Sequence, residues 1–247
     1  MKIEGHVYTR AAKEWSWSYS KLKNYRDCPK RMYEIDVLRN YKEEIKPGSP
    51  LEWGNRVHES VAAALRGVTP LPEEMGSLLQ PWIDRVRSVP GKLYVEQKYA
   101  ITRDFKAAEY FAPNVWYRGI GDVVVIGNPF TDKKTGLRCQ LALILDWKTG
   151  KPIDNSEQLM LMAQCIFTHF PTVTHVRSEF IWLKDNCTTP EVFTRQEVAS
   201  MWVGLLDDVN GLEQATKDLN FPPKPGGLCK SYCAVESCPY WKKGTPR

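Results

Sequence analysis

Gly119-Ile-Gly-Asp-Val-Val-Val-Ile126 is the first of two apolar runs in the middle of the sequence, and Gln140-Leu-Ala-Leu-Ile-Leu-Asp-Trp147 is the second. Apolar, often β-branched residues fill both runs, as they do in buried strands. The segment Asn128–Gly136 between them is polar and contains the Asn, Pro, Asp and Gly residues that favour turns. The two runs are therefore predicted to form an antiparallel hairpin centred near Lys134.

Two acidic residues and a lysine lie at the far end of this predicted hairpin. In a hairpin centred on Lys134, Asp122 lies opposite Asp146. Side chains alternate between the two faces of a strand, so Asp146 and Lys148 project from the same face. Adjacent carboxylates repel each other unless a cation lies between them, and Mg²⁺ or Mn²⁺ suits such hard oxygen ligands. Asp-x-Lys alone is common at solvated strand ends, but together with Asp122 it indicates metal-assisted phosphodiester hydrolysis, with Lys148 orienting water or neutralising charge.

The flanking segments predict helices and further strands, so the expected fold class is α/β or mixed α+β around one sheet. Helices are expected from the N-cap Ser18 to Cys28, from Gly54 to Arg66, in a stretch toward Val89 that Gly76 and Pro81 break, from about Asn155 to Phe170, and after the capping box Thr194-Arg-Gln-Glu197. Further strands are expected over Leu93–Ile101 and His175–Leu183.

The composition narrows the class of protein. The chain has 247 residues, a net charge of +5 and a hydrophobic content of 43%, which is enough for a substantial core. No apolar run approaches the roughly 20 residues that span a bilayer, and the first residues do not resemble a secretory signal. We therefore expect no membrane association and a cytoplasmic location. A mildly basic chain suits a polyanionic partner, and a phosphate-binding Walker loop, which an ATP-driven motor needs, is absent.

Three of the seven cysteines lie close together near the end of the sequence. Cys229, Cys233 and Cys238 are flanked by Pro and Gly, and such spacing lets a loop surround one metal centre. Three thiols leave one ligand missing, and Cys28 in Arg-Asp-Cys-Pro-Lys-Arg is the candidate for it. A four-cysteine site also suits a structural Zn²⁺, and free thiols in a tail are the third interpretation.

Taken together, these motifs resemble the PD-(D/E)xK nucleases of the RecB type, which include the nuclease domains of bacterial recombination helicases and the CRISPR-associated exonucleases. The resemblance extends from Ser18 to Trp241. Gly119-Ile-Gly-Asp122 is similar to the first acidic motif of the family, and Asp146-Trp-Lys-Thr-Gly150 is similar to its Asp-x-Lys-Thr-Gly motif.

The resemblance implies roles for further residues. Gly54-Asn-Arg-Val-His58 is similar to the helix that supplies a metal-binding histidine, Glu96 matches an acidic strand residue, and Gln158 matches the glutamine that opens the fourth motif. Met162 stands where the family often has a tyrosine, so substrate positioning by a tyrosine is not implied here. The implied metal ligands are His58, Asp122, Asp146 and the backbone carbonyl of Trp147, and the implied catalytic residues are Glu96, Asp122, Asp146, Lys148 and Gln158.

The resemblance also implies an architecture and an activity. Residues 1–220 would form a restriction-endonuclease-like core with a central mixed sheet flanked by helices. Residues 221–247 would form a tail that closes a [4Fe–4S] site with Cys28, although the spacing to Cys233 differs by one residue from the usual pattern. The implied activity is a Mg²⁺- or Mn²⁺-dependent DNA exonuclease on single-stranded ends, serving recombination, repair or replication in a bacterial or virus-infected cell, alone or with a protein partner of those pathways. A structure-specific endonuclease and a non-catalytic DNA-binding scaffold are the alternatives.

Overall fold

A computed structural model of the chain describes residues 15–42, 45–153 and 156–243. Its helices are α1 (Tyr19–Asp27), α2 (Pro29–Met32), the π-helix η1 (Tyr33–Val37), α3 (Pro50–Leu65), α4 (Glu73–Ser88), α5 (Glu157–His169), α6 (Arg195–Asp218) and α7 (Leu228–Ser231). Its strands are β1 (Lys92–Ile101), β2 (Ala107–Ala108), β3 (Tyr117–Ile126), β4 (Phe130–Thr131), β5 (Arg138–Cys139), β6 (Leu141–Lys148), β7 (His175–Trp182) and β8 (Cys187–Thr194).

A mixed six-stranded sheet lies at the centre of the described part of the chain. The strands follow the order β2-β1-β3-β6-β7-β8. Neighbours pair antiparallel except β6 and β7, which are parallel and are connected through α5. Because a parallel pair needs a long crossover, α5 must return along one face of the sheet. The predicted mixed α/β class is confirmed.

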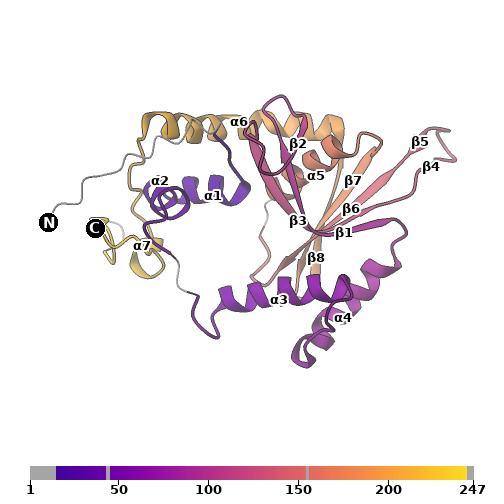
Figure 1. The fold of residues 1–247 in the computed structure, drawn as a ribbon, viewed down its shortest axis with the longest axis horizontal. Coiled ribbons are helices and arrows are strands. Elements are labelled where there is room, and N and C mark those ends of the chain that lie inside the picture. The colour runs from indigo at the N-terminus through magenta and orange to yellow at the C-terminus, as the bar shows by residue number, and fades with distance from the viewer. Residues whose placement is uncertain (1–14, 43–44, 154–155, 244–247) are drawn as a thin grey trace.

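The predicted hairpin is also confirmed, with the expected register. Val123 pairs with Leu145 and Ile126 with Ala142, so that the numbering places Asp122 opposite Asp146. The polar loop between the two strands forms its own small hairpin of β4 and β5, which projects from one end of the sheet (Figure 1). Because side chains alternate along each strand, this register also determines which residues face each layer of helices.

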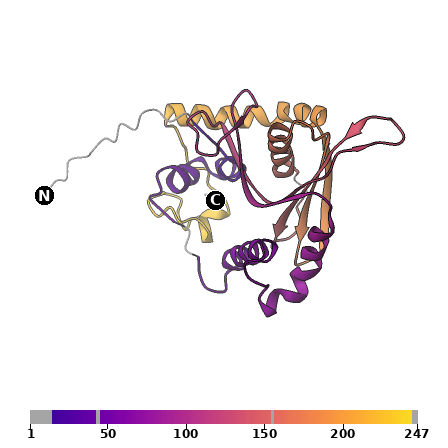
Figure 2. The same ribbon diagram turned by 45° about the vertical axis from the view of Figure 1, so that its right-hand side comes forward.

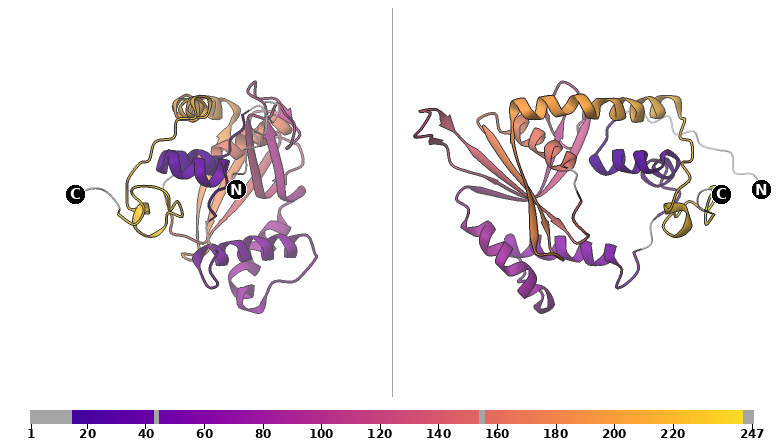
Figure 3. Two further views of the ribbon diagram at one scale, coloured as in Figure 1. Left: turned by 60° about the vertical axis from the view of Figure 1, so that its left-hand side comes forward. Right: turned by 180° about the vertical axis from the view of Figure 1, so that it is seen from behind.

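Helices cover both faces of the sheet. Val124 and Ile144 face α5 and α6, where Leu159 and Trp202 belong to the same core. Alternate strand residues face α3 and α4 and form a second core; they include Val123, Val125, Leu145 and Trp147. The views in Figures 1 and 3 show α5 and α6 on one side of the sheet and α3 and α4 on the other.

The prediction that Gly76 and Pro81 break the helix before Val89 is wrong. Both residues lie within α4, which is continuous over Glu73–Ser88. An apolar stripe along this helix is fully buried, and it consists of Met75, Leu79, Ile83 and Val86. The burial of that stripe offsets the cost of a proline inside a helix, which is about 3 kcal/mol.

The other predicted helices are confirmed with small shifts at their ends. Ser18 caps α1 by accepting a hydrogen bond from the backbone N–H of Lys21, and the capping box of Thr194 and Glu197 opens α6. The helix expected from Gly54 begins earlier, after Ser49, and Asn155 lies outside the described residues.

The helices α1 and α2 and the segment around α7 lie together beside the sheet (Figures 1 and 2). The ring of Phe221 stacks on that of Tyr33 at 4.2 Å between centroids, and the backbone N–H of Lys30 donates to the carbonyl of Pro222. The predicted tail therefore packs against the first helices. In the described residues, no helix is both long and apolar enough to span a bilayer.

Candidate active site

Three acidic residues lie side by side on three neighbouring strands. Glu96 on β1 falls between the pairs Val95–Val123 and Gln97–Gly121, which places it opposite Asp122 on β3. The β3–β6 register likewise places Asp122 opposite Asp146. The backbone of Glu96 has a φ of 51°, a conformation that costs energy in a residue with a side chain and that recurs at functional sites.

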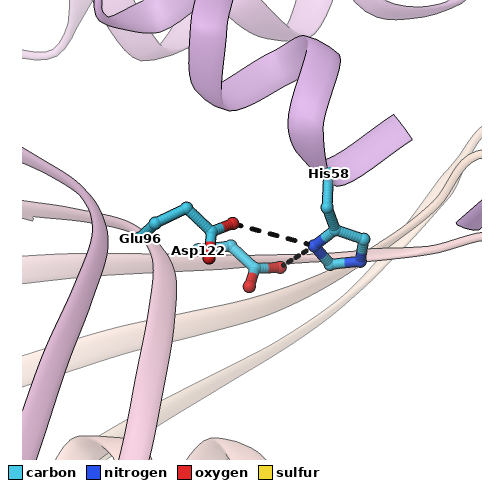
Figure 4. A group of neighbouring side chains, drawn as sticks. All are labelled: His58, Glu96 and Asp122. Carbon is cyan, nitrogen blue, oxygen red and sulfur yellow. Dashed lines mark ion pairs between the residues drawn. The ribbon is translucent and has the colours of Figure 1, made fainter. Parts of the chain in front are cut away.

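His58 extends from α3 toward this row of acids. Its Nδ1 lies 3.1 Å from Oδ2 of Asp122 and 4.0 Å from Oε1 of Glu96. Figure 4 shows the imidazole pointing at both carboxylates. One potential ligand atom from each of His58, Glu96 and Asp122 lies within 4.8 Å of the other two. In the described residues, no other group of three His, Cys, Asp or Glu side chains is as compact. One imidazole and two carboxylates at this spacing form a ligand set that suits a divalent cation.

Asp146 interacts with a different pair of side chains. Its Oδ1 forms an ion pair with Nζ of Lys148 at 2.7 Å, and its Oδ2 accepts a hydrogen bond of 2.5 Å from Nε2 of Gln158. Lys148 in turn donates to Oε1 of Gln158 at 3.0 Å, and its Nζ lies 4.8 Å from the centre of the Phe180 ring. Lysine, aspartate and glutamine therefore form a closed triangle at the start of α5.

The backbone connects the triangle to the His58 group. The backbone N–H of Trp147, the residue after Asp146, donates to Oδ2 of Asp122 at 3.1 Å. The Trp147 ring is buried in the core beneath α3, which fixes the strand at this point. Asp122 thus lies between the two groups and contacts both of them.

The crowding of negative charge changes how these groups titrate. Burial and the neighbouring Asp122 carboxylate together raise the pKa of Asp146 to about 6, against the opposing charge of Lys148. Burial and Asp122 also raise the pKa of Glu96. Burial lowers the pKa of His58, but its hydrogen bond to Asp122 and the negative charge there outweigh that effect, so the net pKa is raised. A cation at this site would relieve the repulsion.

Two glycines allow neighbouring side chains to pack closely around the site. A Cβ on Gly54 would meet Oγ1 of Thr149 at 3.3 Å, so glycine lets α3 pack against the residue that follows Lys148. A Cβ on Gly119 would meet Cε of Met162 at 2.9 Å. Met162 is buried and fills the space beside β3, which is consistent with a core role in place of a tyrosine.

The structure brings together the residues that the sequence singled out, in two groups. His58, Glu96 and Asp122 form the compact group, and Asp146, Lys148 and Gln158 form the triangle. Glu96, expected in a catalytic role, lies among the potential ligands, whereas Asp146 is engaged by Lys148 and Gln158 outside the compact group. The role of the Trp147 carbonyl stays a prediction.

Sequence reasoning missed two supporting contacts. Phe180 lies opposite Asp146 on β7, and its ring contacts the ammonium of Lys148. This contact depends on how β6 and β7 pair, which the sequence alone does not give. Arg26 on α1 pairs through both terminal nitrogens with Glu157, the residue before Gln158. The Arg26 contact joins two segments far apart in the sequence, and no local pattern signals it.

The four cysteines of the predicted cluster line one small pocket between α2 and the tail. Cys28 is buried, Cys229 lies on α7, and Cys233 and Cys238 follow it. Two hydrogen bonds hold the loop. The backbone N–H of Lys242 donates to the carbonyl of Cys229, and the indole N–H of Trp241 donates to the carbonyl of Cys233. The structure therefore gathers the same four thiols that the sequence pattern selected.

The comparisons with known proteins identify no family. No family model and no curated protein matches the chain. Among solved structures, the crystal structure of SSO0001 covers 92% of this chain and 87% of its own, with 14% identity and a TM-score of 0.39.

Proposed function

We propose that the chain is a Mg²⁺- or Mn²⁺-dependent DNA nuclease of the PD-(D/E)xK superfamily that degrades single-stranded DNA from its ends. The observation that carries the proposal is the row of Glu96, Asp122 and Asp146 across three adjacent strands, flanked by His58 and Lys148. A chance Asp-x-Lys at a strand end has no reason to lie beside two further acids and a histidine from separate elements.

The side chains divide the work of hydrolysis between them. His58, Glu96 and Asp122 would hold the cation, with Asp146 at its edge, and the cation would supply the acidity that turns water into hydroxide. Lys148 would direct its ammonium toward the attacking oxygen or the phosphoryl oxygens, where negative charge accumulates. Gln158 holds the side chains of Lys148 and Asp146 in position through one hydrogen bond to each. Attack at phosphorus forms one P–O bond and breaks another, and the leaving oxygen takes a proton from solvent.

The test is degradation of end-labelled single-stranded DNA by the purified protein with Mn²⁺. We expect Lys148→Gln to lower the rate by about 100- to 1,000-fold, because it removes a charge from the developing transition state. Asp146→Ala should abolish activity. The matched control is Asp207→Asn, an exposed acid on α6 away from the site, which should retain the wild-type rate. Full activity in Asp146→Ala would refute the assigned site.

Circular single-stranded DNA separates the proposed activity from its alternative. An exonuclease has no end on which to start, so the circle should survive while a linear strand of the same sequence is consumed. Cleavage of both at similar rates would replace the exonuclease with a structure-specific endonuclease. Binding without cleavage of either would indicate a scaffold.

We further propose that Cys28, Cys229, Cys233 and Cys238 hold a [4Fe–4S] cluster with a structural role. Four buried or half-buried thiols around one pocket fit a cluster. Around a single Zn²⁺ with bonds of about 2.3 Å, tetrahedral geometry places sulfurs about 3.8 Å apart. A structural Zn²⁺ held by the same four thiols is therefore the alternative that metal analysis must distinguish.

Metal analysis and colour test the cluster. We expect a brown protein with iron and acid-labile sulfide in equal amounts and a broad visible absorbance that dithionite bleaches. Cys187→Ser, which changes an exposed thiol outside the pocket, is the control and should stay brown. Colourless protein with one equivalent of zinc would establish the zinc alternative.

A further inference from the structure

An open, aromatic pocket lies on the edge of the sheet beside the acidic row. It has a volume of about 670 Å³ and is bordered by β1, the residues after β2 and the end of α5. Its principal side chains are Tyr94, Lys98, Tyr99, Tyr110, Phe111 and Phe170. None of these residues takes part in the hydrolytic site described above.

The aromatic side chains of this pocket differ in how accessible they are. Tyr99 is buried against the rings of His169 and Phe170 and forms a rigid wall. Phe111, in contrast, is 72% exposed, and its ring packs edge-on against Tyr110. Phe111 therefore offers an accessible aromatic ring beside the pocket.

Positive charge surrounds the exposed ring. Nζ of Lys98 lies 5.4 Å from the centre of Phe111 and 5.5 Å from that of Tyr110. The guanidinium of Arg118 lies 5.4 Å from the Tyr110 ring and 6.0 Å from that of Phe111. Glu109 is the acidic residue of the lining. Flat rings interleaved with cations are what binds an unpaired base and its phosphate.

The pocket shares strand β1 with Glu96, and Asp122 lies on the neighbouring strand. Gln97 and Lys98, which line the pocket, pair with Gly121 and Ile120, which adjoin Asp122. Gln158 and His169 are about 16 Å apart along α5, a separation that a few nucleotides of single strand span. α5 connects the two sites, with Gln158 at its start and His169 at its end.

We propose that this pocket binds an unpaired nucleobase of the DNA strand a few nucleotides from the scissile phosphate. The base stacks on Phe111, and Lys98 contacts the adjoining phosphate. The inference rests on the proposed nuclease function and explains how a single strand, whose bases are free to stack, is distinguished from a duplex. It assigns Phe111 and Lys98 as substrate-binding residues.

A double-mutant cycle between protein and DNA tests the stacking. Affinity for a short single strand is measured in an Asp146→Asn background, with the wild-type pocket or with Phe111→Ala, and with each position of the strand in turn replaced by an abasic site. We expect Phe111→Ala to weaken binding by about 10-fold. One abasic position should weaken binding to the wild-type pocket equally and should have no further effect on Phe111→Ala.

Two more measurements complete the test. Fluorescence of 2-aminopurine at the sensitive position should be quenched on binding to the wild-type pocket and not to Phe111→Ala. Phe130→Ala is the matched control, because Phe130 is an exposed phenylalanine on the distant β4–β5 hairpin. Lys98→Gln should lower affinity and reduce its salt dependence, whereas Lys133→Gln in the same hairpin should not.

The outcomes separate the inference from the function beneath it. If Phe111→Ala and every abasic strand bind as tightly as their parents, the base pocket is wrong while the nuclease stands. If the Asp146→Asn protein still cuts DNA, or the wild-type protein neither binds nor cuts it, the proposed function itself fails. Equal losses in Phe111→Ala and Phe130→Ala would show a general effect on folding and would overturn the pocket.

Discussion

Oδ2 of Asp122 lies 3.1 Å from Nδ1 of His58, and the same oxygen accepts the backbone N–H of Trp147 at the same distance. A single carboxylate therefore connects α3 on one face of the sheet with the strand that carries Asp146. Its charge serves the proposed metal, and its hydrogen bond serves the backbone. These two roles predict different results for two substitutions.

Asp122→Asn should abolish activity with little loss of stability. The amide oxygen can still accept the N–H of Trp147, but the ligand charge is gone. Asp122→Ala should also unfold at lower urea, because a buried donor without an acceptor costs about 1–3 kcal/mol. Nuclease assays and urea unfolding of both variants measure the two effects. Equal stability of the two variants would show that the hydrogen bond contributes nothing.

Mn²⁺ affinity should fall with acidity below about pH 6. The Asp146 carboxyl, with a pKa raised to about 6, takes up a proton as the pH falls, and a cation must displace that proton to bind. Protonation of His58, whose pKa is also raised, acts in the same direction. Calorimetric titrations from about pH 5 to about pH 8 should show affinity falling up to about 10-fold per unit for each competing proton. Affinity that is constant over this range would contradict the assignment.

Cys28→Ser should release the tail. The proposed cluster is what fastens Cys229, Cys233 and Cys238 to the junction of α1 and α2, so its loss should bleach the protein and expose the segment after Phe221 to protease. The Cys187→Ser variant should be as resistant as the wild type. Limited proteolysis followed by mass spectrometry identifies the cut. A brown, protease-resistant Cys28→Ser protein would exclude Cys28 as a ligand.

Thr194→Ala should destabilise the protein by about 1 kcal/mol, because Thr194 caps α6 and accepts the backbone N–H of Glu197. Urea unfolding at constant m-value measures the change. Ser200→Ala, in the exposed interior of the same helix, is the comparison and should have a smaller effect. A loss as large in Ser200→Ala would show that helix propensity, not capping, dominates.

The hairpin at the centre of the fold was predictable because its two apolar runs follow each other in the sequence and a polar segment with turn residues joins them. Val123, Val124 and Val125 are all buried because helices cover both faces of the sheet, and alternation along the strand assigns them in turn to the two cores. The placement of Asp122 opposite Asp146 follows directly. That Asp146 lies outside the compact ligand group was not predictable, because it depends on Gln158 arriving from a helix after the strand.

Elsewhere, the position of an element in the fold outweighed local preference. α4 contains Pro81, and β8 contains Pro190, and local rules discourage both elements. Pro190 is tolerated because β8 is the edge strand, where one side of the backbone lacks a partner strand. β8 went unpredicted for this reason. The docking of the tail onto α2 depends on contacts between residues nearly 200 positions apart, such as Lys224 N–H to Cys28 Sγ, and no window of sequence contains both.

The ion pair of Arg26 with Glu157 bears on how sensitive the protein is to air oxidation. Arg26 lies two residues before Cys28, its backbone carbonyl accepts a hydrogen bond from Lys224 of the tail, and Glu157 directly precedes Gln158. The four thiols of the proposed cluster are therefore connected, through Arg26, Glu157 and Gln158, to the lysine of the proposed site. We expect exposure to air to abolish the proposed nuclease activity while the sheet is still folded. Anaerobic handling should therefore protect the activity more than low temperature does.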